Sequence, residues 1–158
     1  MEPIREKRHR LADEVYRGSV KVCFTMCIRG RVPFFVDENI FKTFELFLLN
    51  KLAAFKCEAF IYLFMPDHLH AIISGTHKDS DIKKCVDRFK QASGFWLKQN
   101  TKGVKWQKDY YDHIIRNEED LRNQINYILM NPVKANLIDH WKGYPFKGST
   151  VLELADFV

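Results

Sequence analysis

The sequence predicts an α+β fold of the ferredoxin-like, split βαβ plan, in which helices pack on an antiparallel sheet. Two observations lead to this prediction. Segments rich in β-formers alternate with segments whose apolar residues recur at helical spacing, in the order β-α-β-β-α-β. The two central strands are separated only by Pro66-Asp67, a turn so short that it makes them an antiparallel hairpin. A further helix follows this unit.

The first half of the chain supplies the first strand, the first helix and the hairpin. Ser19–Ile28 alternates apolar and other residues and is predicted as a strand. Asp37 is expected to cap an amphipathic helix with an inner stripe of Ile, Phe and Leu. Glu58–Phe64 is the second strand, and the third starts at His68 and ends near Ser74-Gly75.

The second half continues the plan and then adds the extra helix. A helix is predicted over Ser80–Gln99, and a strand over Tyr110–Arg116. Asn117 is a good N-cap, and three acidic residues follow it in the first turn, where the helix dipole favours negative charge. This last helix is expected to meet Asn131-Pro132, where proline disfavours helical geometry in the residue before it.

Length and composition indicate one folded domain over residues 1–158, with a basic N-terminal arm over 1–14. The chain is 46% hydrophobic and 28% charged, which is typical of a globular protein. Its longest apolar run, Ala59–Met65, is too short to cross a bilayer, and the first ten residues are charged rather than apolar. Four cysteines without CxxC spacing suit a reducing compartment, so we expect a cytoplasmic protein.

The net charge of +5 makes a polyanion a better candidate partner than a cation. Scattered lysines usually form an ordinary solvated surface, and that interpretation holds for most of them. The candidate contacts to DNA phosphates are Arg5, Lys7, Arg8, Arg10, Lys83, Lys84, Lys90 and Lys98, and Tyr110 is a candidate for stacking on bases.

Two histidines separated by one residue, His68-Leu69-His70, are the most distinctive feature of the chain. Alternation along a strand places both imidazoles on one face of the sheet, where they make half of a divalent-metal site. The competing interpretation is a pair of structural histidines, and the motif alone does not exclude it.

Tyr127 and Asn131 stand four residues apart and project from one face of the predicted helix, a turn from each other. The competing interpretation is a half-buried tyrosine and an asparagine that closes the helix. A hard cation such as Mg²⁺ or Mn²⁺ accepts imidazole and amide-oxygen ligands together and leaves positions for phosphate oxygens. If the histidine strand and this helix lie side by side, the two histidines, Asn131 and Tyr127 would form an active site for phosphodiester transfer.

Three blocks resemble the REP-associated branch of the single-tyrosine transposases, which belong to the HUH endonuclease superfamily. The first block is Met65–Ile73 with the histidine pair, the second is Trp106–Arg116, and the third is Tyr127–Ile138. They occur in the order typical of that family. Two positions depart from the common pattern: Asp67 stands where many relatives have Asn, and Asn136 where many have Gly.

The resemblance implies a metal-dependent endonuclease and strand transferase for single-stranded DNA, acting near a DNA hairpin. It implies that Tyr127 is the nucleophile that forms a covalent link to a 5′-phosphate, and that His68, His70 and Asn131 hold Mg²⁺ or Mn²⁺. Related transposases work as dimers that can exchange the tyrosine helix, whereas the REP-associated branch need not, so the resemblance leaves a homodimer open. It also implies a bacterial protein that associates with the nucleoid when bound.

Two other functions fit the same pattern: a non-catalytic nucleic-acid-binding module on this fold, and a metal phosphodiesterase that uses activated water. We expect His68→Ala to eliminate cleavage and spare folding, because a ligand on an exposed face contributes little to the core.

Overall fold

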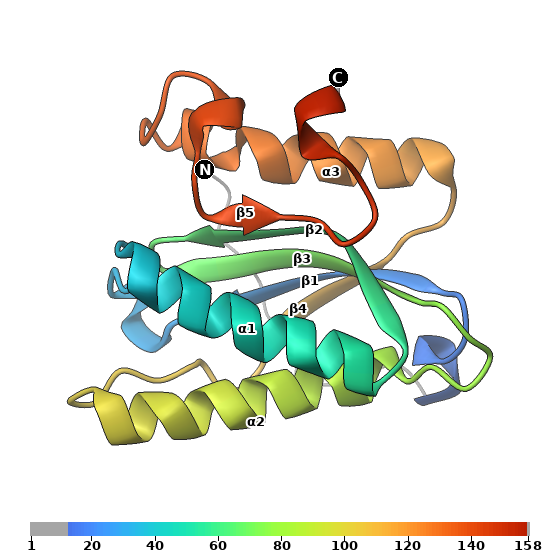
Figure 1. Cartoon of the computed structure of the whole chain (residues 1–158), viewed down its shortest axis with the longest axis horizontal. Coiled ribbons are helices and arrows are strands. Elements are labelled where there is room, and N and C mark those ends of the chain that lie inside the picture. The colour runs from blue at the N-terminus through green and yellow to red at the C-terminus, as the bar shows by residue number, and fades with distance from the viewer. Residues whose placement is uncertain (1–12, 158) are drawn as a thin grey trace.

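The computed structural model describes residues 13–157, which form one antiparallel sheet with helices on both faces (Figure 1). The sheet has five strands in the order β4-β1-β3-β2-β5. The strands are β1 (Lys21–Cys27), β2 (Cys57–Met65), β3 (His68–Gly75), β4 (Tyr111–Ile114) and β5 (Lys147–Gly148). The first four follow the split βαβ plan, which confirms the predicted fold class, and the two-residue β5 adds to the free edge of β2.

The main helices begin where their capping residues predict. They are α1 (Glu38–Ala54), α2 (Ile82–Asn100) and α3 (Glu118–Lys134). The side chain of Asp37 accepts hydrogen bonds from the backbone of Asn39 and Ile40, and that of Asn117 accepts one from Asp120. Helices α1 and α2 cover one face of the sheet, and α3 lies across the other (Figure 1).

Short 3₁₀ helices connect these elements: η1 (Asp13–Tyr16), η2 (Arg29–Arg31), η3 (Trp141–Gly143) and η4 (Leu154–Asp156). Within the described part of the chain, no helix combines the length and the hydropathy that crossing a bilayer requires.

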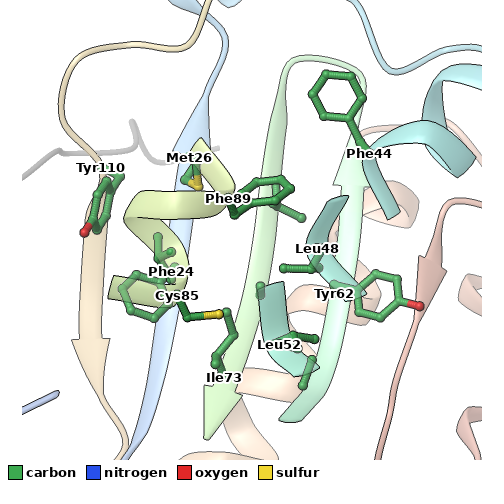
Figure 2. Close-up of a cluster of buried hydrophobic side chains, with 14 of the residues drawn as sticks. Phe24, Met26, Phe44, Leu48, Leu52, Tyr62, Ile73, Cys85, Phe89 and Tyr110 are labelled. Atoms are coloured by element: carbon green, nitrogen blue, oxygen red, sulfur yellow. The ribbon is translucent and has the colours of Figure 1, made fainter. Parts of the chain in front are cut away.

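The larger hydrophobic cluster lies between the sheet and the α1–α2 layer (Figure 2). Phe44 of α1 is fully buried there and makes edge-on contacts with several aromatic rings, among them Phe35, Trp96 and Trp106. A second cluster holds α3 on the opposite face, through side chains such as Ile72 of β3 and Ile128 of α3. Every residue of β3 is buried, because the strand lies at the centre of the sheet with helices on both sides.

One row of paired residues crosses the sheet and positions the candidate site. His70 of β3 pairs with Thr25 of β1 on one side and with Leu63 of β2 on the other. The row ends at Tyr111 of β4, next to Thr25, and at Lys147 of β5, next to Leu63. Directly paired residues point to the same face of an antiparallel sheet, so all five lie on the face that α3 covers.

Some predicted boundaries differ from the structure. Strand β4 is shorter than predicted and excludes Tyr110 and Arg116. Helix α3 does not end at Asn131-Pro132 but continues to Lys134. Proline removes only one backbone donor, and the backbone amide of Ala135 still bonds to the carbonyl of Asn131. The helix ends before Asn136, whose φ of 59° is the left-handed conformation in which helices commonly stop.

Candidate functional site

The two histidines open β3, and their imidazoles meet beneath α3. Their Nε2 atoms lie 3.1 Å apart. His68 is 1% exposed and His70 is 4% exposed. The expectation that the pair lies on an exposed sheet face is therefore wrong, because α3 packs over it. A His68→Ala change would leave a cavity, so loss of stability in that variant would not distinguish a structural histidine from a ligand.

The other ring nitrogen of each histidine has its own partner. Nδ1 of His68 lies 2.6 Å from a carboxylate oxygen of Asp67, and Nδ1 of His70 lies 2.9 Å from the hydroxyl of Thr25. A carboxylate only accepts, so the Nδ1–H of His68 donates to Asp67. This contact leaves the Nε2 lone pair of a neutral His68 facing His70, as in metal sites where a carboxylate orients the ligand histidine.

Arg31 holds Asp67 from the other side. Its Nε donates to Asp67 over 2.8 Å, and Nη2 lies 3.4 Å from Nδ1 of His68. Burial would raise the pKa of Asp67, but the hydrogen bonds from His68 and Arg31 outweigh it and lower the pKa to about 2. Arg31 has a φ of 54°, a left-handed conformation that is uncommon outside glycine. Because its pKa is low, Asp67 is a carboxylate at neutral pH, and it fixes the orientation of the His68 ring.

Asn131 links the strand to the helix. Its Nδ2 donates to Nε2 of His70 over 3.1 Å, and the residue is 4% exposed. Its Oδ1 is also buried and has no hydrogen-bond partner among the described residues. A buried amide oxygen without a partner costs about 1–3 kcal/mol, whereas a cation bound there would satisfy it. A rotation of the side-chain amide by 180° would exchange the positions of Nδ2 and Oδ1, so that the oxygen, which can bind a cation, would face His70.

The electrostatics of His70 suit a neutral ligand. Burial, followed by the positive charges of His68 and Arg31, lowers the pKa of His70 well below 6.5. Its imidazole therefore stays uncharged at neutral pH, and the Nε2 lone pair that accepts the bond from Asn131 could bind a cation instead. Two imidazole nitrogens and one amide oxygen are a donor set that Mg²⁺ or Mn²⁺ accepts.

Tyr127 lies beside this donor set but at the surface. The centroid of its ring is 6.2 Å from that of His70, and the residue is 46% exposed. Nζ of Lys134 lies 5.4 Å from the ring centroid, one turn beyond Asn131 on the same helix. The phenol is accessible to a macromolecule, has a cation nearby and stands next to the candidate metal ligands, so Tyr127 is a candidate nucleophile.

Acidic metal clusters do not compete with this site. Among residues 13–157, no group of three or more His, Cys, Asp or Glu side chains is placed to hold a metal ion. The cysteine closest in register to the site, Cys27, pairs with His68, and Cys23 pairs with Ile72. Burial raises the pKa of Cys23 to about 12, so this thiol is a poor metal ligand at neutral pH.

The predicted DNA contacts are not gathered at the site. Lys83, Lys84, Lys90 and Lys98 belong to α2, on the opposite side of the sheet from α3. Arg5, Lys7, Arg8 and Arg10 lie outside the described residues. Lys83 and Lys90 do line a surface groove of about 530 Å³ together with Asp87 and Tyr110.

Stacking on Tyr110 does not fit the structure. Its ring is 5% exposed, contacts Phe24 edge-on, and its hydroxyl donates to Asp87 (Figure 2). The neighbouring Tyr111 is less buried and lies on the α3 face, in the row of His70. Alternation along the strand predicts that Tyr110 and Tyr111 point to opposite faces of the sheet. Which of them faces the histidines depends on how β4 pairs with β1.

Comparison with known proteins gives the class of this protein. The family described as "Transposase IS200 like" matches residues 16–131, a span that includes the histidine pair, Tyr127 and Asn131. The chain is an enzyme of the transposase type. It belongs to the IS200-like transposase family, and the resemblance seen in its three sequence blocks is confirmed.

Individual relatives agree with this assignment. A REP-associated tyrosine transposase of Escherichia coli K12 is 30% identical over 89 residues, which are 54% of this chain and 50% of that protein. A Haemophilus influenzae Rd protein whose name also contains "REP-associated tyrosine transposase" is 22% identical over 135 residues, 78% of this chain and 76% of its own. A solved REP-associated tyrosine transposase bound to a REP hairpin shares the fold, with a TM-score of 0.74 at 23% identity, covering 89% of this chain and 81% of that one.

Proposed function

We propose that this transposase cuts and rejoins single-stranded DNA through a covalent bond between Tyr127 and a 5′-phosphate, with Mg²⁺ or Mn²⁺ held by His68, His70 and Asn131. One observation carries the proposal. Among the described residues, the buried Oδ1 of Asn131 has no hydrogen-bond partner, and it lies near the two facing imidazoles and one helical turn from the half-exposed Tyr127.

The chemistry follows from this placement. The phenolic oxygen of Tyr127 attacks the phosphorus of the scissile phosphodiester, so an O–P bond forms while the bond to the 3′-oxygen breaks. The phenol loses its proton and the departing 3′-oxygen gains one, which leaves a 3′-hydroxyl. Reversal of the same step by a 3′-hydroxyl rejoins the strand. A bound divalent cation would neutralise charge on the phosphate, and the Lys134 ammonium adds positive charge beside the nucleophile.

A DNA hairpin next to the cut site is the substrate we propose. The solved relative of the same fold is bound to a REP hairpin. The positive net charge of this chain suits a nucleic acid. Such a substrate would be met on the nucleoid, in the bacterial cytoplasm. A homodimer stays a prediction.

The decisive experiment is an adduct gel. A hairpin-bearing single-stranded oligonucleotide labelled at its 3′ end is incubated with Mn²⁺ and either wild type or Tyr127→Phe, then separated under denaturing conditions. We expect a labelled protein band with wild type and none with Tyr127→Phe. Tyr111→Phe is the matched control. It removes a tyrosine hydroxyl from the sheet face that α3 covers, but not the proposed nucleophile, so the band should remain.

Each other outcome selects a rival. Cleavage by wild type without a labelled protein band would favour the phosphodiesterase that uses water. Binding without cleavage would favour the non-catalytic nucleic-acid-binding module.

A further inference from the structure

A second groove lies on the same side of the sheet as Tyr127. It has a volume of about 370 Å³ and is formed by η3, the turn that leads into β5, and η4. Its lining includes Trp141, Lys142, Tyr144, Pro145, Lys147 and Leu154. Among the described residues that line it, only the two lysines carry a charge.

The sheet register places this groove close to the candidate catalytic centre. Leu63 of β2 pairs with His70 on one side and with Lys147 on the other. Two strand spacings therefore separate Lys147 from His70, which is about 10 Å. Helix α3 contacts η3, and both lie over the same face of the sheet (Figure 1).

The groove combines an aromatic face with cations. The Trp141 residue is partly exposed, and the exposed His140 stacks on its ring with centroids 5.9 Å apart. Nζ of Lys142 lies at 5.6 Å and Nζ of Lys147 at 5.9 Å from the indole centroid. The ammonium of Lys147 donates to the carbonyls of Lys142 and Tyr144, so this lysine is fixed in place. Lys142 is exposed, and its side chain is free to turn from the indole toward a bound phosphate.

The groove on α2 lacks this combination. Its lining includes the carboxylates of Asp87 and Asp109 among its basic residues, and the Tyr110 ring there is buried. Carboxylates repel a phosphate and a buried ring offers no face to a base. Of the two grooves, the one at Trp141 fits a nucleotide better.

We propose that the Trp141 groove binds one nucleotide of the single strand that flanks the bond cut by Tyr127, with its base stacked on Trp141 in place of His140 and its phosphate contacting Lys142. This inference rests on the proposed function, because it needs a single-stranded DNA substrate at the catalytic face. It assigns a substrate subsite to residues that follow the tyrosine helix.

Binding measurements test this subsite in the Tyr127→Phe background, where no cleavage occurs. The probe is a fluorescent hairpin oligonucleotide with single-stranded flanks. We expect Trp141→Ala to weaken binding about tenfold, because base stacking on an aromatic ring contributes on that scale. Trp141→Phe keeps an aromatic face and should recover most of the affinity. The flanks should also quench indole fluorescence, and Trp141→Phe should abolish that part of the quenching.

Lys142→Gln supplies an independent test, because Lys142 is exposed and we expect its replacement to leave folding unchanged. The slope of log affinity against log salt should fall by about 0.7, the value for one phosphate contact on a single strand. Lys108→Gln, in the α2 groove, is the charge-matched control and should leave the slope near that of the parent. Unchanged affinity in Trp141→Ala, or equal slope changes in Lys142→Gln and Lys108→Gln, would overturn the subsite.

Failure of the subsite and failure of the proposed function are distinguishable. A wild-type protein that forms the covalent adduct while Trp141→Ala binds normally refutes the subsite alone. Absence of any adduct from wild type refutes the nucleophile, whatever Trp141 binds.

Discussion

The Nε2 atoms of His68 and His70 face each other across 3.1 Å beneath α3. Asp67 accepts the Nδ1–H of His68, and Asn131 donates to Nε2 of His70. The two Nε2 atoms are therefore close enough to contact one cation together. A cation bound between them would be held by one nitrogen from each histidine. Four predictions test this arrangement and the fold that supports it.

Added Mn²⁺ should stabilise the protein against heat. A ligand at a hundred times its Kd stabilises the folded state by about 2.7 kcal/mol, which corresponds to a rise in Tm of about 5–10 °C for a chain of this size. Thermal unfolding with Mn²⁺ and then with excess EDTA measures the rise and its reversal. The double variant His68→Gln/His70→Gln should show no rise, whereas His113→Gln should behave as wild type because His113 pairs with Asp120 instead. An equal rise in the double variant would place the metal elsewhere.

Asn131→Leu should separate metal binding from folding. The change removes the buried Oδ1 that has no partner, but it also removes the hydrogen bond to His70. These effects oppose each other, so we expect the free energy of unfolding without metal to stay within about 1 kcal/mol of wild type. Calorimetric titration should show Mn²⁺ affinity reduced at least tenfold. Wild-type affinity in this variant would remove Asn131 from the ligand set.

Asp67→Asn should lower stability in a pH-dependent way. The pKa of Asp67 is lowered to about 2 in the folded protein from its ordinary value of 3.8, which applies to the unfolded chain. Its stabilisation is therefore complete above about pH 4 and is lost as the pH falls toward 2. We expect wild type to exceed Asp67→Asn by about 1 kcal/mol at pH 6, and by less at pH 3, in urea unfolding at both values. A constant difference would show that the charge of Asp67 is not what matters.

Phe44→Ala should test the aromatic core. Removing a fully buried phenyl ring leaves a cavity and costs about 3–5 kcal/mol. Leu46→Ala, two residues away and 59% exposed, should change stability by less than about 0.5 kcal/mol. Urea unfolding of both variants measures the contrast, and similar losses in the two would contradict the assigned burial.

The fold could be predicted from the sequence because each helix and strand contains a local signal of its own type or of its ends. Asp37 and Asn117 cap their helices, and the turn at Pro66-Asp67 forces the hairpin. They were sufficient, too, for placing His68 and His70 on one face. They could not show that α3 buries that face, because no local pattern records which helix packs on which side.

Residues that support the site depend on long-range register. Thr25 stands 45 positions before His70 and becomes its partner only when β1 pairs with β3. Arg31 reaches Asp67 across 36 positions. Likewise, the choice between Tyr110 and Tyr111 as the tyrosine on the histidine face depends on how β4 pairs with β1. Such contacts are properties of the assembled sheet and not of any segment.

Helix α3 has a separate consequence for control of the reaction. Tyr127 and Asn131 both belong to α3, whereas His68 and His70 belong to β3 of the sheet. The contacts that seat α3 belong to a different hydrophobic cluster from those that hold α1 and α2. A small shift of α3 would thus move the proposed nucleophile and the proposed ligand Asn131 together relative to the two histidines.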